Sequence, residues 1–203
     1  MSRNALIDLP PTKLDVAVAD VCAGIARPSF VRGIQVLTYL ADEKPLLAAA
    51  ALAWVFVRST SDDPRLERGA DQMLRSVAIA GVLPQWLVAR ERPDRVRVHG
   101  RRHCIPKSGN AWDSFPSGHA VHVGALAHAV TRMAPRHARR WVWPIAAALS
   151  GTRIVLLAHY LSDVLAGLAF GDVIDKVVGR QFDRAQNHKR QASKTRRAGL
   201  ARV

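Results

Sequence analysis

Apolar and polar positions along the chain predict helices of two kinds. Five stretches are apolar almost throughout, which exceeds the one-sided stripe of a soluble amphipathic helix. They are residues 45–57, 76–89, 120–131, 141–158 and 164–178. Two weaker stretches, about 13–27 and 29–41, are also helical, and LDVAVADVCAGIA in the first has the amphipathic pattern of an interfacial helix. Strand-like alternation of useful length is missing, so the pattern predicts an all-α protein.

The lengths of the apolar runs favour a membrane protein whose helices pack mainly on one another. A full span needs about 20 predominantly apolar residues, so each shorter run needs its flanks to cross a bilayer. We expect an integral membrane bundle of about five to six transmembrane helices plus an amphipathic N-terminal helix, and a soluble helical bundle stays an alternative. The expected division is an interfacial segment 1–28, a membrane domain 29–180 and a basic, disordered cytoplasmic tail 181–203.

The charge balance indicates an anionic partner. The chain has 30 Lys and Arg against 16 Asp and Glu, a formal net charge of +14. If the five apolar stretches cross in alternation, the connectors 58–68 and 132–140 and the tail after 179 share one Arg-rich face, which the positive-inside rule makes cytoplasmic. The loop 90–116 on the opposite face is basic too, as expected for a face that attracts an anion.

The sequence indicates neither a cleaved signal peptide nor a nucleic-acid-binding module. The start MSRNALIDLPPTKLD lacks an apolar core followed by a small-residue cleavage site, so no cleaved signal peptide is expected. A soluble nucleic-acid binder is the alternative that the basic charge suggests. The charge is accompanied by no aromatic platform or recognisable nucleic-acid module, so we expect no nucleic-acid partner.

If the apolar stretches alternate in this way, three polar clusters lie at the face opposite the cytoplasmic one. They are RERPDR at 90–95, DSFPSGHAVH at 113–122 and GTRIVLLAHYLSD at 151–163. Ionisable residues near a membrane are costly and usually functional. In the middle cluster Ser117 can cap a helix and Gly118 lets a ligand approach the backbone. The helix N-terminus then forms an anion site, and its dipole with nearby arginines lowers the pKa of His119.

The last cluster combines a histidine with a carboxylate. His159 and Asp163 are four residues apart, so on a helix they share a face, where the carboxylate would fix the tautomer of the imidazole. Arg153 is six residues before His159, about 240° around a regular helix. The two share a pocket only if the helix bends or ends between them.

These clusters, in this order, resemble the type 2 phosphatidic acid phosphatase family, which is related to vanadium haloperoxidases. That family's pattern is a lysine, six residues and Arg-Pro; then Pro-Ser-Gly-His; then Ser-Arg, five residues, His, three residues and Asp. The matching positions are Arg92-Pro93, Pro116-Ser117-Gly118-His119, Thr152-Arg153, His159 and Asp163. Threonine replaces serine at 152, and Gln85 stands where the lysine belongs. Arg90, Arg95 or Arg97 are candidates to supply the missing charge.

The resemblance implies a metal-independent phosphatase that needs no cofactor. It makes His159 the nucleophile that forms a phosphohistidine, Asp163 its orienting group and His119 the acid that protonates the leaving oxygen. Phosphate binding falls to Arg92, Arg153, the Ser117–Gly118 backbone and, as a hydrogen-bond donor, Gln85. The remaining histidines form no convincing metal set.

The expected substrate is a membrane lipid phosphate or diphosphate: phosphatidic acid, phosphatidylglycerophosphate, a polyprenyl diphosphate or phosphorylated lipid A. The active site is expected on the non-cytoplasmic face of a bacterial-type cytoplasmic (inner) membrane. Because Gln85 replaces a cation, a catalytically weak or inactive homologue that binds anionic lipid headgroups stays the alternative.

Overall fold

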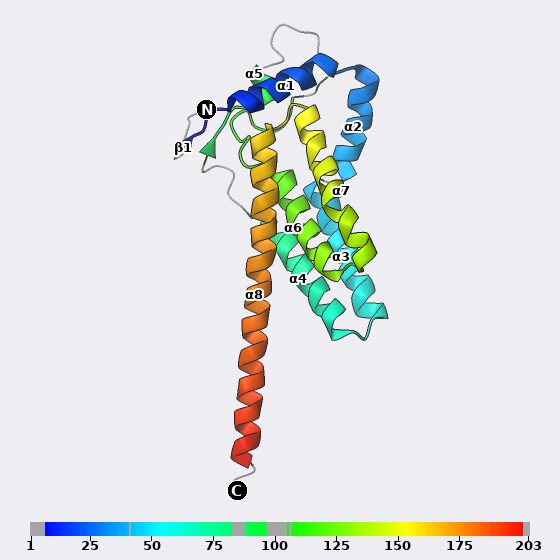
Figure 1. The fold of residues 1–203 in the computed structure, drawn as a ribbon, viewed down its shortest axis with the longest axis vertical. Coiled ribbons are helices and arrows are strands. Elements are labelled where there is room, and N and C mark those ends of the chain that lie inside the picture. Colours follow the sequence, from blue (N-terminus) through cyan, green and yellow to red (C-terminus); the bar gives the residue numbers. More distant parts are fainter. Residues whose placement is uncertain (1–6, 41, 83–87, 97–104, 106, 201–203) are drawn as a thin grey trace.

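The computed structural model describes residues 7–40, 42–82, 88–96, 105 and 107–200 (Figure 1). The described chain is mainly helical, with one pair of two-residue strands in parallel. The elements are β1 (Ile7–Asp8), α1 (Lys13–Ile25), α2 (Pro28–Leu40), α3 (Glu43–Thr60), α4 (Pro64–Ala80), β2 (Val88–Ala89), α5 (Pro93–Val96), α6 (Gly118–Met133), α7 (Arg136–Val155) and α8 (Leu161–Leu200).

Most predicted helices are present close to their expected positions, but the stretch 76–89 is not one helix. α4 ends at Ala80, after starting at Pro64 behind an Asp63 cap. The helix therefore begins earlier than predicted, over a polar sequence in which one set of residues is buried. The prediction from the continuous apolar run was wrong because α4 is amphipathic. A helix that packs against α6 and α8 needs only one apolar stripe.

The centre of the fold is the close packing of α6 against α8, through glycines. A Cβ built on Gly171 would lie 2.1 Å from the carbonyl oxygen of Val121, and one built on Gly124 would lie 2.4 Å from that of Leu168. Only glycine leaves room for two helix backbones at this separation. The contact fixes the start of α6, with His119, beside the start of α8, with Asp163.

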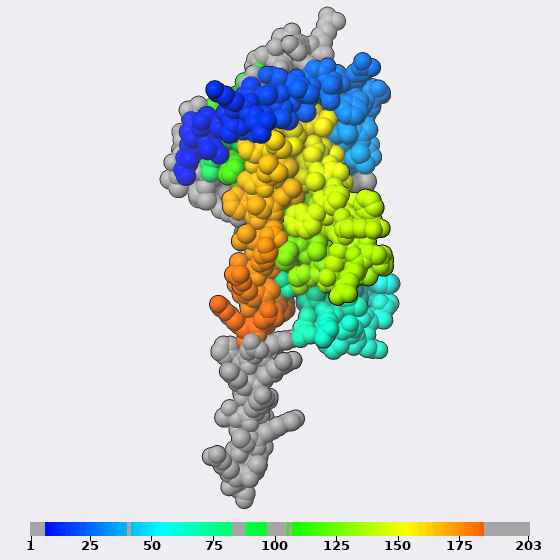
Figure 2. Space-filling model, in the orientation of Figure 1, coloured from blue at the N-terminus to red at the C-terminus, as the bar shows by residue number. Residues whose placement is uncertain are grey.

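The two ends of the bundle differ in what they carry. The α3–α4 and α6–α7 connections lie towards one end, and α8 extends beyond it (Figure 1). At the other end, the starts of α6 and α8 meet the end of α7, and α1 lies across them (Figures 1 and 2). The sequence predicts a disordered tail over 181–203, whereas in the structure α8 continues as a helix through Leu200.

Within the described residues, no helix is both long and apolar enough to meet the criterion for crossing a membrane.

Candidate active site

The chain leaves α7 by a sharp turn that brings Arg153 and His159 to the same side. α7 ends at Val155, and Leu157 takes a left-handed conformation with φ of 52°. The amides of Ala158 and His159 both donate to the carbonyl oxygen of Arg153, at 3.0 and 3.3 Å. Leu157 is fully buried and its carbonyl accepts from the amide of Asp94, which holds this costly conformation in place. This is the irregularity that a shared pocket requires.

His159 is buried and has a defined tautomer. Its Nδ1 lies 2.7 Å from the carbonyl oxygen of Ser114, which can only accept, so Nδ1 carries the proton. Its Nε2 therefore has the lone pair and faces Nη1 of Arg92 at 3.3 Å. Burial, and then the positive charges of Arg92 and Arg153, lower the pKa of His159 well below 6.5. The ring is therefore neutral at neutral pH, with its unprotonated nitrogen facing Arg92.

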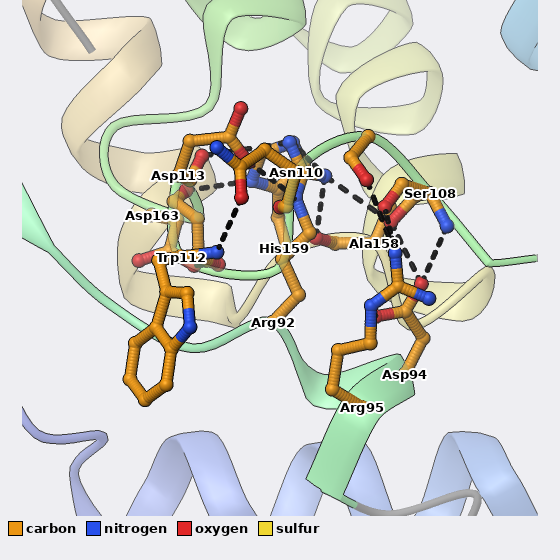
Figure 3. Close-up of polar contacts among 12 residues, drawn as sticks. Arg92, Asp94, Arg95, Ser108, Asn110, Trp112, Asp113, Ala158, His159 and Asp163 are labelled. Carbon is orange, nitrogen blue, oxygen red and sulfur yellow. Dashed lines mark hydrogen bonds and ion pairs between the residues drawn. The ribbon is translucent and has the colours of Figure 1, made fainter. Parts of the chain in front are cut away.

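Arg92 is fixed by the loop around it (Figure 3). Its Nε donates to Asp113 Oδ1 at 2.8 Å and to the carbonyl oxygen of Asn110 at 2.9 Å, while Nη1 donates to Ser108 Oγ and the carbonyl oxygen of Ala158. Only about 6% of this side chain is exposed. A planar guanidinium held this rigidly beside Nε2 of His159 can bind a phosphoryl oxygen with little loss of entropy.

Asp163 does not contact His159 directly, contrary to the expectation from the i, i+4 spacing. His159 precedes α8, so the two residues are not on one regular helix. In the described structure the Asp163 carboxylate instead accepts from Ser114 Oγ at 2.6 Å, from the amide of Tyr160 at 2.7 Å and from Arg90. Ser114 thus joins the two, because its hydroxyl donates to Asp163 while its carbonyl accepts from His159.

The start of α6 follows the expected cap with one difference. Ser117 is the N-cap, and its hydroxyl accepts from the amide of Ala120. The sequence predicts that the amide of Ser117 binds phosphate. In the structure this amide instead donates to the carbonyl oxygen of Asp163 at 3.1 Å and is not available to a phosphate. Gly118 opens α6 and lines a small cavity together with His119.

His119 stands just before the apolar stretch 120–131, with its imidazole almost buried. Burial, and less strongly the charge of Arg153, lower its pKa, although hydrogen bonding to Asp42 opposes the shift. The expected lowering is therefore present, with burial as its main cause. The charge of His119 in turn acts on His159, which indicates that the two rings share one electrostatic environment.

Two cavities meet at Asp42 and Arg153. One, of about 170 Å³, is lined by polar groups of the α3 and α6 starts, among them His119. The other, of about 360 Å³, is lined partly by Ser108 and Ala158, both of which contact Arg92. Arg153 lines both cavities and His119 lines the smaller one, while Arg92 and His159 contact each other and the loop residues next to the larger one. Gln85 lies outside the described residues.

A family model described as the PAP2 superfamily matches residues 72–186. The chain belongs to the PAP2 superfamily. This match confirms the resemblance drawn from the sequence motifs, and it contains all the residues expected in the site. α1, α2 and α3 lie outside it.

Two relatives of this chain are named lipid A 1-phosphatases and come from Rhizobium etli and Rhizobium johnstonii. They are 40% and 41% identical to this chain over 103 and 100 residues. These matches cover 49% and 47% of this chain but only 44% and 41% of the relatives, so the chain matches less than half of their length.

Solved PAP2 structures share the fold. Aquifex aeolicus LpxE superposes with a TM-score of 0.63 at 15% identity, covering 83% of this chain and 96% of that one. A transmembrane PAP2-type phosphatidylglycerolphosphate phosphatase from Bacillus subtilis gives 0.60 at 21% identity, covering 84% and 85%.

Sequence motifs missed a buried ion-pair network behind the PAP2 site. Arg90, a candidate replacement for the missing lysine, is only 2% exposed and pairs with Asp15 and Asp163. Asp15 also accepts from the amide and hydroxyl of Ser162. A signal for Asp15 was present: it shares the i, i+4, i+7, i+8 stripe of α1 with buried Ala19, Cys22 and Ala23.

Arg95 does not supply the missing charge to the site either. Its Nη2 donates to the backbone carbonyls of Ser108 and Gly109. Arg97 lies outside the described residues.

Proposed function

We propose that this PAP2 chain is a metal-independent phosphatase that removes a phosphoryl group from a membrane lipid phosphate or diphosphate through a phosphohistidine. The observation that carries the proposal is the state of His159. Its Nδ1 holds the proton, its low pKa keeps the ring neutral, and the lone pair of Nε2 accepts from the Arg92 guanidinium at 3.3 Å, a donor that a phosphoryl group under attack can take over.

The proposed reaction has two displacements at phosphorus. In the first, Nε2 of His159 bonds to phosphorus, the bond to the lipid oxygen breaks, and His119 gives that oxygen a proton. In the second, His119 takes a proton from water, the water oxygen attacks phosphorus, and the P–N bond breaks to release inorganic phosphate. Arg92 and Arg153 stabilise the phosphoryl oxygens throughout. The carbonyl of Ser114, a residue whose hydroxyl donates to Asp163, stabilises the positive imidazole formed in the first step.

A membrane location is supported by the apolar side chains on the outside of the bundle. α3, α7 and α8 all expose large hydrophobic residues, and soluble proteins rarely expose so many of them together. Examples are Leu52, Val55, Phe56, Trp141, Ile145, Leu165, Phe170 and Val173. We place the site on the non-cytoplasmic face of a bacterial inner membrane, because the Arg-rich connectors and the tail lie towards the opposite end.

Among possible substrates, phosphorylated lipid A is the first to test, because the two curated relatives are named lipid A 1-phosphatases. Phosphatidic acid, phosphatidylglycerophosphate and polyprenyl diphosphates belong in the same panel. An inactive homologue that binds anionic lipid headgroups is the competing function, and Gln85 in place of lysine is the observation that favours it.

The test is phosphate release from this panel by purified wild type, His159→Ala and Gln85→Lys in detergent micelles, with and without EDTA. We expect release by the wild type, loss of at least about a thousandfold in His159→Ala, and no effect of EDTA. Higher activity of Gln85→Lys would show that the missing cation limits turnover. A wild type that releases no phosphate from any substrate would leave the headgroup-binding function, and full inhibition by EDTA would refute the metal-free mechanism.

A further inference from the structure

Asp42 is an acidic side chain inside a site built for anions. It directly precedes α3, outside the residues matched by the family. Its Oδ1 lies 3.3 Å from Nδ1 of His119 and 3.8 Å from Nη1 of Arg153. These are the general acid and one of the two phosphate-binding arginines of the proposed reaction, so this inference rests on that function.

The two ring nitrogens of His119 have different surroundings. Nε2 is buried from solvent, whereas Nδ1 faces Asp42 at the junction of the two cavities. A proton passed to a leaving oxygen must therefore come from Nδ1. The Asp42 carboxylate occupies the position that such an oxygen would need, and it also contacts Arg153 as a phosphoryl oxygen would.

The carboxylate is held loosely enough to leave. Both of its contacts are longer than those typical of a strong charge-assisted hydrogen bond. Its side chain is 43% exposed, unlike the other buried carboxylates of the site. Asp42 is also the N-cap residue of α3 but makes no side-chain capping bond, although aspartate at this position normally accepts from an amide of its own helix. A displaced carboxylate thus has a second place to bind nearby.

We propose that Asp42 is an internal competitor for the phosphate site: its carboxylate occupies the space between His119 and Arg153 until the substrate's phosphoryl group displaces it. The residue then sets the affinity of the site for phosphate, not the rate of the chemical step. Weak anions and free phosphate are held poorly, while a substrate anchored by its lipid portion competes successfully.

The charges around Asp42 support this arrangement. The groups that face it are Glu43 from its own helix, His119 and His122 from α6, and Arg153 from α7. The hydrogen bond from His119, followed by the charge of Arg153, lowers the pKa of Asp42 despite its partial burial. The site therefore favours an anion at this point, and Asp42 is ionised wherever the enzyme would work.

The test compares Asp42→Asn with Glu43→Gln in the 203-residue chain. Each removes one negative charge beside the same cavity, but Glu43 is exposed and has no contact with His119 among the described residues. We expect Asp42→Asn to lower both KM and the inhibition constant of inorganic phosphate about fivefold, the effect of losing one competing charged contact. We expect kcat to change less than KM, because a displaced Asp42 no longer contacts His119 or Arg153 once substrate is bound, and Glu43→Gln to change each constant less than about twofold.

A second readout does not depend on turnover. Inorganic phosphate is titrated by calorimetry into His159→Ala with and without Asp42→Asn, where we expect about fivefold tighter binding in the double variant. A wild type without activity would defeat the proposed function, yet this titration would still decide the role of Asp42. Equal effects of Asp42→Asn and Glu43→Gln, or a fall in kcat with unchanged phosphate binding, would overturn the competitor role. The latter result would make Asp42 a positioning residue for His119.

Discussion

The imidazole of His159 lies between a carbonyl that fixes its proton and a guanidinium that faces its lone pair. The Ser114 carbonyl holds Nδ1–H, and Arg92 lies beside Nε2. This arrangement keeps the ring neutral, because a second proton would be buried next to a permanent cation. The same guanidinium that lowers the pKa of His159 can also bind a phosphoryl oxygen.

The pKa shifts of the two histidines predict an acidic optimum for kcat/KM. His159 must be neutral and its pKa lies well below 6.5, while His119 must be protonated and its pKa is also lowered. Activity therefore rises as pH passes the pKa of His159 and falls as it passes that of His119, so the maximum lies below pH 6.5. The measurement is kcat/KM from pH 4 to 9, with His137→Gln at the far end of the chain's α7 as a control. A maximum at or above about pH 7.5 would contradict this assignment.

Residue identities were easier to predict than residue contacts. The motifs placed Arg92, Arg153, His119 and His159 in one region, as the structure does. They also predicted a direct contact between His159 and Asp163, which was wrong because the chain turns at Leu157 and enters α8 only after His159. No local pattern signals a left-handed leucine, since its cost is offset by burial that the fold provides.

α6 begins with His119 in its first turn, and α8 begins just after His159, so the separation of these two helices affects how far apart the two histidines lie. Small residues were visible in both apolar stretches, yet nothing in the sequence says which of them face each other. The structure identifies Gly124 and Gly171 as the points of closest approach. Apolar periodicity predicts that a helix is present, but its partner depends on the fold as a whole.

At this scale we predict that Gly171→Ala destabilises the protein. The new Cβ would lie 2.1 Å from the carbonyl oxygen of Val121 and 2.5 Å from the amide nitrogen of Ala125, and backbone atoms of α6 cannot move aside singly. We expect a loss of about 1–3 kcal/mol, with lower kcat because His119 shifts away from His159. Thermal unfolding in detergent measures the effect. Gly33→Ala in α2, where the structure places no described atom within 4 Å of the Cβ, should be neutral or slightly stabilising.

The whole molecule is organised as a polar site at one end of the bundle and basic connectors towards the other. Alternation of the apolar stretches predicted this separation, because it depends only on the order and number of helices. The N-terminal helix was predicted as a separate interfacial segment. In the structure α1 packs on α7 and α8, and its buried Asp15 carboxylate pairs with Arg90. That contact joins residues 75 positions apart, which local periodicity cannot reveal.

We predict that the stability of the whole fold depends on the Asp15 carboxylate. It bonds to Arg90 at 2.7 Å, and Arg90 in turn holds Asp163. Removing the Asp15 charge leaves a buried guanidinium with one partner fewer, so Asp15→Asn should cost about 2–4 kcal/mol of unfolding free energy. It should also lower kcat, because the chain Arg90–Asp163–Ser114 positions His159. Asp20→Asn on the same helix, at an exposed position, should cost less than about 0.5 kcal/mol.

The acid dependence of this loss tests its electrostatic origin. Burial alone would raise the pKa of Asp15, but hydrogen bonds from Ser162 and Thr12 lower it from 3.8 to about 2. The carboxylate therefore stabilises the fold fully above pH 3.8, and this contribution disappears as pH falls through about 2. Unfolding of the wild type and Asp15→Asn, followed from pH 6 downward in detergent, should converge below pH 3.8. A constant difference across that range would show that Asp15 acts through packing, and an unchanged kcat in Asp15→Asn would show that α1 stabilises the bundle without positioning the nucleophile.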